Sequence, residues 1–120
     1  MKLKKSIRFG DAETPAVGLD DAGIVVLPLC YENAPSYGTG SKEGPLHILN
    51  ASTQLECIDE ETLTNWGEAG IYTLPPLVPS NDPKKAVNEM KRAAAAVLVK
   101  NKFLLSLGGD HAISIGPIMA

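Results

Sequence analysis

The 120-residue sequence has no long hydrophobic run and only two cysteines, and each shortage excludes a class of protein. No apolar stretch approaches the ~20 residues needed to span a bilayer, so we expect no membrane partner. The charged start, Met-Lys-Leu-Lys-Lys, is not followed by the apolar segment of a secretory signal. Cys30 and Cys57 lack CxxC spacing. We therefore expect a reduced, soluble, cytoplasmic protein whose thiols act as small apolar groups.

Positive charge is also too sparse and too scattered for nucleic-acid binding. The chain has 11 Lys and Arg against 14 Asp and Glu, a net charge of −3. The one basic cluster, Lys2, Lys4, Lys5 and Arg8, has no interleaved aromatic residues and is soon followed by acidic ones. Because nucleic-acid binding needs a basic face, we interpret residues 1–22 as a solvated amino-terminal arm and expect no nucleic-acid partner.

Three short apolar runs predict β-strands. Residues 23–29 contain a continuous β-branched run, which is typical of a strand buried on both faces. We expect Pro28 at the end of this strand because proline cannot donate to a central ladder. A second strand is expected at residues 70–74, before a Pro-Pro pair, and a third at residues 103–107.

Helices are predicted between these strands. Pro45 suits the first turn of a helix that runs to about Thr53. Asp82 and Pro83 supply the N-cap and the first residue of a longer helix. The core-facing positions of the two helices are Leu46, Leu49 and Thr53 in the first and Val87, Met90, Ala94, Val97 and Leu98 in the second. The state of the acidic segment 56–68 is left open. The alternation of strands and helices predicts an α/β fold with a parallel sheet.

The polar loop at residues 31–45 is long, and such loops inside compact domains are usually functional or disordered. Its Gly-Thr-Gly-Ser-Lys run, residues 38–42, lacks the Gly-Lys-Ser/Thr order of a phosphate-binding loop. Glu43 stands where a dinucleotide-binding loop needs glycine. A nucleotide-binding half-domain would therefore rest on fold analogy alone.

The residues that follow the third strand are Gly108, Gly109, Asp110 and His111. Ligands of open α/β sheets gather outside the carboxyl ends of the strands. Two glycines permit backbone angles that are closed to residues with a Cβ. His111 is therefore a candidate metal ligand or catalytic base, and Asp110 a candidate group that orients its ring. The alternative is that this Asp-His pair only caps the following helix.

Two segments resemble one known family, the ureohydrolases, which include arginases and agmatinases. Residues 107–115, Leu-Gly-Gly-Asp-His-Ala-Ile-Ser-Ile, resemble its Gly-Gly-Asp-His-Ser signature. Residues 36–52 resemble its Ser-Tyr-x-x-Gly-x-x-x-Gly-Pro-x-x-Ile-x-x-Ala-Ser segment. The resemblance covers about residues 23–120, and the agmatinase branch is the more similar one.

This resemblance implies a three-layer α/β/α sandwich with a mainly parallel sheet, incomplete in this chain. Residues 1–22 would be an arm and residues 23–120 the amino-terminal part of the ureohydrolase domain. The site assignments that it implies are a manganese ligand (His111), a supporting aspartate (Asp110), the turn (Gly108 and Gly109) and two candidate substrate contacts in the loop (Ser36 and Tyr37). Ala112 departs from the family's serine, so a local hydroxyl is missing. The family's other ligands, an Asp-x-His-x-Asp run and an Asp-x-Asp run, have no counterpart here.

The activity that the resemblance implies is hydrolysis of a small guanidino compound, such as agmatine, to an amine and urea. A hydroxide activated by two Mn²⁺ ions would attack the guanidino carbon, in a homo-oligomer of three or six chains. One histidine cannot hold two divalent ions, so we expect the isolated chain to be inactive and to contain no catalytic residue. The alternative is a truncated, non-catalytic assembly module. We expect His47 to lie on the surface, and the strand at residues 103–107 to expose an apolar edge.

Overall fold

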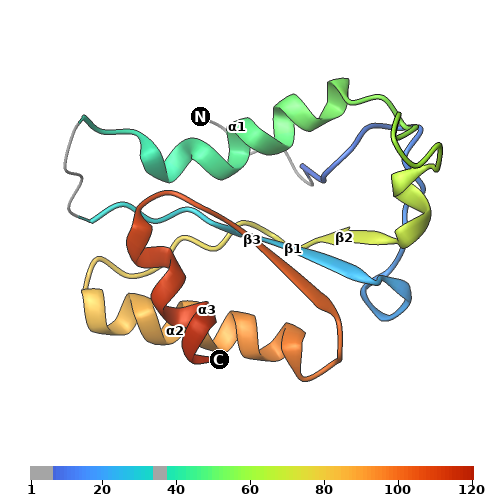
Figure 1. The fold of residues 1–120 in the computed structure, drawn as a ribbon. Helices are drawn as coiled ribbons and strands as arrows, with labels where there is room; N and C mark the ends of the chain where they lie inside the picture. The colour runs from blue at the N-terminus through green and yellow to red at the C-terminus, as the bar shows by residue number, and fades with distance from the viewer. Residues whose placement is uncertain (1–6, 34–37) are drawn as a thin grey trace.

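The computed structural model describes residues 7–33 and 38–120, and Figure 1 shows their arrangement around a small parallel sheet. The sheet has the strand order β2–β1–β3, with β1 at Ile24–Leu29, β2 at Ile71–Thr73 and β3 at Phe103–Gly108. Helix α1 (Gly44–Ala51) covers one face, and α2 (Pro83–Leu98) and α3 (Ile115–Met119) lie on the other. The predicted α/β/α layering with a parallel sheet is confirmed.

Short 3₁₀ helices join or extend these elements within the described residues. They are Leu19–Asp21, Ser41–Glu43, Ser52–Gln54, Trp66–Ala69 and His111–Ser114. Two of them flank α1 and one leads into α3. Every helix in the described part of the chain is too short or too polar to cross a membrane.

Strand β1 is the buried centre of the sheet, as its unbroken apolar run predicts. All its residues after Ile24 are buried. Pro28 lies inside this central strand, one residue before its end. It is tolerated there because its carbonyl accepts the Leu77 N–H at 2.9 Å, which shows that its nitrogen faces the side where β2 has already ended.

Helix α2 begins as its sequence predicts, with the Asp82 carboxylate accepting the Lys84 N–H at 3.0 Å. Its buried positions differ in part from the predicted stripe: they are Ala86, Met90, Ala94 and Val97. Val87 is only half-buried and Leu98 is 40% exposed. The buried positions follow steps of four, four and three residues from Ala86, so the predicted stripe was wrong at Val87 and Leu98, each of which lies one position beside a buried residue.

Helix α1 buries Leu46 and Leu49 as predicted, but Ser52 rather than Thr53 continues the inward face. The helix tightens to 3₁₀ geometry after Ala51, and three residues per turn move the inward position from 53 to 52. The Ser52 hydroxyl donates to the Leu49 carbonyl and accepts the Gly10 N–H at 3.0 Å. This contact ties α1 to the arm.

The described part of the arm, residues 7–22, is hydrogen-bonded to β2 and to the 3₁₀ turn that follows α1. The Phe9 N–H donates to the Thr73 hydroxyl at 2.9 Å. Arg8 is half-buried and donates to the carbonyls of Asp11 and Thr14. The prediction of a solvated arm is thus wrong for Arg8, because its guanidinium donates hydrogen bonds to two backbone carbonyls instead of to water. The other three residues of the basic cluster, Lys2, Lys4 and Lys5, lie outside the described residues.

Strand β3 leaves apolar side chains uncovered, as predicted. It is the outer strand of the sheet on its side, paired with β1 in the described structure. Phe103 is 67% exposed and Leu105 is also exposed. On the other face, Ile118 of α3 is 81% exposed. These surfaces lack a covering layer within the described residues.

Candidate functional site

The parallel register brings three separate segments together at the carboxyl edge of the sheet. Leu29 at the end of β1 lies opposite Gly108 at the end of β3. Just beyond, the Asp110 N–H donates to the Tyr31 carbonyl at 3.1 Å. The third segment is the 3₁₀ turn at Ser41–Glu43, which leads into α1. The candidate site is therefore built on strand ends and a helix start, where the fold predicts a ligand.

Gly109 is required here by space and not by backbone angle. A Cβ on Gly109 would lie 2.2 Å from the Tyr31 carbonyl oxygen and 2.9 Å from that of Ser41. A Cβ on Gly108 would lie 2.3 Å from the Ile113 side chain. Neither glycine has a positive φ. The predicted turn exists, but the proposed reason was wrong: close packing of three backbone segments excludes a side chain.

The Asp110 carboxylate is hydrogen-bonded to the loop that follows β1. It does not cap the 3₁₀ helix at His111–Ser114. The Ser41 hydroxyl lies 2.9 Å from Asp110 Oδ1, and the Asn33 N–H donates to Oδ2 at 3.0 Å. The 3₁₀ helix His111–Ser114 receives no side-chain cap bond from Asp110. The capping alternative is therefore wrong for this carboxylate. Its hydrogen-bond partners, Ser41 and Asn33, lie 69 and 77 residues earlier in the chain, so a distant segment holds the turn at residues 108–111 in place.

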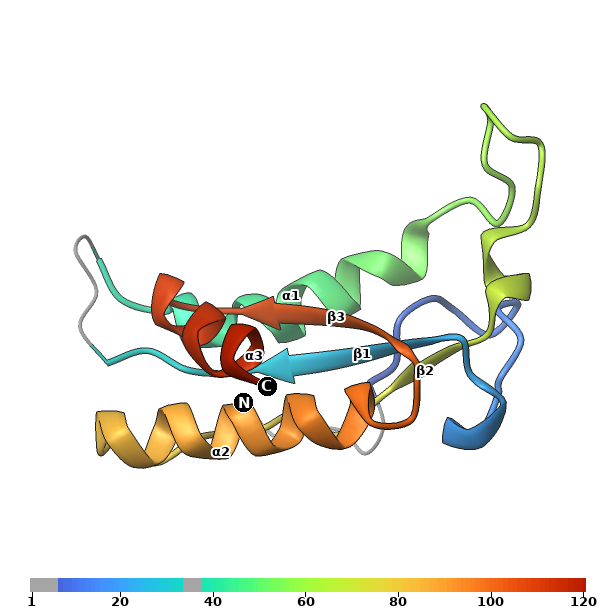
Figure 2. The same ribbon diagram turned by 60° about the horizontal axis from the view of Figure 1, so that its bottom comes forward.

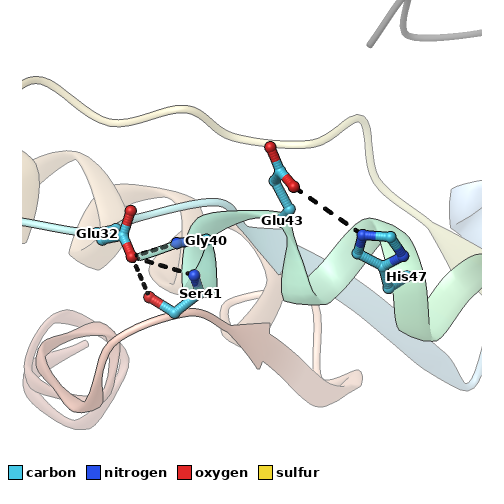
Figure 3. A network of polar contacts seen from close by, with 5 residues as sticks. All are labelled: Glu32, Gly40, Ser41, Glu43 and His47. Atoms are coloured by element: carbon cyan, nitrogen blue, oxygen red, sulfur yellow. Dashed lines mark hydrogen bonds and ion pairs between the residues drawn. The ribbon is translucent and has the colours of Figure 1, made fainter. Parts of the chain in front are cut away.

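Glu32, which the sequence did not single out, accepts three hydrogen bonds at one oxygen (Figure 3). Its Oε1 receives the N–H groups of Gly40 at 2.8 Å and Ser41 at 3.1 Å, and the Ser41 hydroxyl lies at 3.0 Å. Gly40 adopts a φ of 108°, which favours glycine. A carboxylate shortly after a predicted strand end, followed by Gly-Ser before a helix, is the signal that could have identified Glu32.

His111 is the first residue of the 3₁₀ helix after this turn, and it is exposed. An exposed imidazole at a strand end can bind a metal ion. Among residues 7–33 and 38–120, no three His, Cys, Asp or Glu side chains gather in a way that could hold a metal. Oxygen-rich manganese sites need carboxylates. His111 thus fits as one ligand, and the described residues do not complete a manganese site.

The remaining candidate residues lie apart from this turn or outside the described residues. His47 is exposed on α1, with its Nε2 4.0 Å from Glu43 Oε2, so its predicted surface position is confirmed (Figure 3). Cys30 is buried beyond the end of β1, and burial raises the pKa of its thiol. Ser36 and Tyr37, the candidate substrate contacts, lie outside the described residues.

An apolar hollow of about 840 Å³ lies at the opposite, amino end of the strands. Its lining includes Ile24 and Ile71, the first residues of β1 and β2, and the aromatic side chains of Phe9 and Trp66. Its polar lining consists of carboxylates and one amide, on residues 54–61. No histidine lines it. The hollow and the candidate metal ligand therefore occupy opposite edges of the sheet.

Comparison with known proteins agrees with this arrangement. The model of the arginase family matches residues 22–120. N(1)-aminopropylagmatine ureohydrolase of Synechocystis sp. is 42% identical over 106 residues, which cover 83% of this chain and 35% of that protein. Agmatinase of Pyrococcus horikoshii is 29% identical over 122 residues, covering 97% of this chain and 42% of that protein.

The fold agrees as well. The crystal structure of agmatine ureohydrolase of Thermoplasma volcanium matches with a TM-score of 0.80 and 27% identity, over 85% of this chain and 35% of that one. The chain thus spans between 35% and 42% of the length of these relatives. The family match extends over most of the chain and includes both sequence motifs. This chain belongs to the arginase family, and its three-strand sheet with flanking helices is part of an arginase-like α/β fold.

Proposed function

We propose that the full-length protein containing this chain is a manganese-dependent ureohydrolase of a guanidino compound, and that His111 is one of its metal ligands. One observation carries the proposal: His111 is an exposed imidazole at the carboxyl end of β3, on a turn held in place by two other segments. The hydrolase family of the relatives supports it. The proposed enzyme works in the cytoplasm as a homo-oligomer.

In the proposed enzyme, the residues of this chain bind the metal ion and position the turn that carries its ligand. His111 offers its imidazole to the metal, and Asp110 holds the turn through Ser41 and the Asn33 N–H. When bound, manganese supplies the positive charge that lowers the pKa of water and polarises the guanidino carbon. Ala112 brings no hydroxyl to the turn. Ser36 and Tyr37 are proposed to contact the substrate from the loop.

The proposed substrate class is a guanidino group on an aliphatic amine. Two relatives are named for agmatine or N(1)-aminopropylagmatine, which share that group. In the reaction, the oxygen of water forms a bond to the guanidino carbon, and the bond from that carbon to the alkyl nitrogen breaks. The alkyl nitrogen takes a proton, so the products are urea and a protonated amine.

The test is urea release by the full-length protein with Mn²⁺ and a panel of agmatine, N(1)-aminopropylagmatine, arginine and guanidinobutyrate. We expect His111→Ala to lose manganese and activity by more than the 10- to 100-fold that follows loss of a group behind a metal ligand. His47→Ala, the exposed histidine on α1, is the matched control and should behave as wild type. A folded His111→Ala protein with full manganese content would overturn the ligand assignment.

A second candidate function, a non-catalytic assembly module, is favoured by the uncovered apolar side chains of β3 and α3, Phe103 and Ile118 among them. It applies to the 120-residue chain expressed by itself. We expect this chain to release no urea and to self-associate through these surfaces. Manganese binding with urea release by the 120-residue chain would reject the module.

A further inference from the structure

The apolar hollow at the amino end of the strands has no part in the proposed function. Its lining includes Leu55 and Ile58, which are 49% and 52% exposed, and the half-buried side chains of Phe9 and Trp66. Its volume of about 840 Å³ lies within the range of small-molecule sites, roughly 300–1,000 Å³. The described residues therefore leave an apolar surface of the size of a ligand site uncovered at this edge.

The two aromatic side chains of the hollow are held in place by contacts of their own. Phe9 and Trp66 pack edge to face, with an angle of 73° between their ring planes. The indole N–H donates to the Glu56 carbonyl, and the Phe9 N–H donates to the Thr73 hydroxyl. A ligand in the hollow therefore meets rings whose positions are already fixed. Of the aromatic side chains, that of Trp attracts cations most strongly.

The hollow also carries a concentrated negative charge. The loop that follows α1 projects beyond the amino ends of β1 and β2 (Figure 2) and contributes four carboxylates to the lining: Glu56, Asp59, Glu60 and Glu61. In the part of the chain that the structure describes, the ion pairs lie elsewhere, at Glu43 and Asp20, and the lining contains no Lys, Arg or His. The described residues thus leave this charge without a paired cation.

We propose that this hollow binds a linear aliphatic polyamine, a methylene chain that carries ammonium groups. The methylenes lie on the apolar lining, where their removal from water favours binding, and the ammonium groups lie against the carboxylates and the indole ring. A neutral apolar ligand leaves the charge unused, and an anion is repelled by it. A second copy docked through the same face brings four further carboxylates against these four, so like-charge repulsion disfavours it.

The first test is calorimetry of the full-length protein with 1,4-diaminobutane and 1,8-diaminooctane. The two probes carry the same charge and differ by four methylenes. Because burial of one methylene strengthens binding about fourfold, we expect 1,8-diaminooctane to bind at least about tenfold more tightly. Equal affinities would mean that only the charge cluster attracts the probes, and this result, like no binding of either probe, would overturn the proposal.

A lysine in the hollow should compete with the ligand. Ile58→Lys removes an apolar contact and places a cation among the carboxylates, so 1,8-diaminooctane should bind at least about tenfold more weakly. Leu63→Lys is the matched control, because it makes the same change in the same loop at a residue that is 77% exposed and outside the lining. We expect it to weaken binding by less than about threefold. Thermal unfolding checks that both variants are folded, and equal losses in the two would overturn the proposed site.

The contribution of the carboxylates is measured with the double variant Glu60→Gln and Glu61→Gln. The amides keep the shape of the side chains and remove two exposed charges. Both diamines should therefore bind about two- to tenfold more weakly, and the ratio of their affinities should persist. Unchanged affinities would show that charge does not select the ligand, which would overturn the choice of a polyamine.

His111→Ala separates this inference from the proposed function, on which it does not depend. The hollow and His111 lie at opposite edges of the sheet, so this variant should lose manganese and still bind 1,8-diaminooctane as wild type does. If His111→Ala abolishes diamine binding and Ile58→Lys does not, the diamine binds in the active site, and the inference fails while the proposed function stands. If wild type releases no urea from any guanidino compound, the proposed function fails, and the affinities of Ile58→Lys and Leu63→Lys still decide the inference.

Discussion

Two aspartates at opposite edges of the sheet make the same kinds of hydrogen bond with partners at very different distances along the chain. Asp59, in the acidic loop at the amino edge, accepts the N–H groups of Glu61 and Thr62 at 3.0 and 2.8 Å. Asp110, at the carboxyl edge, accepts the Asn33 N–H and lies against the Ser41 hydroxyl. The first set spans two or three residues, and the second spans 77 and 69.

This difference shows which polar contacts depend on the fold. An aspartate that bonds to its own following backbone makes a local turn and can do so in a short peptide. The contacts of Asp110 exist only after β1 and β3 have paired and α1 has docked. A carboxylate held in this way is positioned by the whole domain. The amino edge has a self-contained turn, whereas the carboxyl edge has the geometry expected of a site.

The largest expected effect comes from adding a side chain at Gly109, where three backbone segments pack closely at the carboxyl edge. Gly109→Ala would place a Cβ 2.2 Å from a backbone oxygen, so the segments from β1 and β3 must move apart. We expect a loss of about 1–3 kcal/mol of stability or more, together with loss of manganese binding. Thermal unfolding and calorimetry on the full-length protein measure both.

Gly18→Ala supplies the control for that change. A Cβ at Gly18 meets no heavy atom within 4 Å, and its φ of −75° suits any residue. We expect a change within about 0.5 kcal/mol and unaltered manganese binding. Equal effects of the two substitutions would contradict the importance of the close backbone packing at the carboxyl edge.

The next effect compares the two aspartates directly. We expect Asp110→Ala to weaken manganese binding about 10- to 100-fold, because it removes the group that holds the ligand turn. Asp59→Ala should leave manganese affinity unchanged, because its hydrogen bonds to the chain stay within its own loop. Titration of metal-free, full-length variants with Mn²⁺ measures the difference. An Asp110→Ala protein that binds the ion as tightly as the Asp59→Ala protein would remove the distinction between the edges.

A smaller effect is expected from the aromatic pair at the amino edge. Phe9 and Trp66 pack edge to face with ring centroids 5.6 Å apart, and the indole N–H donates to the Glu56 carbonyl at 2.6 Å. Trp66→Phe keeps an aromatic ring and loses this bond, which should cost about 0.5–1 kcal/mol. Manganese affinity should not change. A stability loss accompanied by weaker metal binding would show that the two edges are coupled through the sheet.

The same contrast explains what could be predicted from the sequence. The three strands and α2 follow local signals, an apolar run or an Asp-Pro start, and the structure agrees with the predicted strand ends within a residue. The motif at residues 108–111 was placed correctly at a strand end. The reason predicted for its glycines, a special backbone angle, was wrong. Glycine is required at position 109 because the backbone of Tyr31 and Ser41, far away in the chain, leaves no room for a side chain.

Glu32 was missed for the same physical reason. Its carboxylate becomes informative only when the loop returns Gly40 and Ser41 to it and β3 places Asp110 beside them. Sequence periodicity carries no information on such a return. The burial of Ser52 was missed because the end of the helix tightens to 3₁₀ geometry, which shifts the buried position by one residue.

The smallest expected effect is a pH dependence confined to the amino edge. The Thr62 N–H, then the Thr62 hydroxyl, and more weakly the Glu61 N–H, stabilise the ionised Asp59 and lower its pKa, against a smaller opposing effect of desolvation. Because the folded pKa lies below the unfolded value of about 3.9, the turn gains stability above that value and loses it as pH falls through the folded pKa. We expect amide protection of Glu61 and Thr62 to fade only below about pH 4.

The carboxyl carbon of Asp59, followed by NMR, should titrate at a lower pH than in a peptide of residues 56–64 in denaturant. Asp59→Asn removes the titration and should make this protection independent of pH. A midpoint equal to that of the unfolded peptide would mean that the loop does not form this turn in solution.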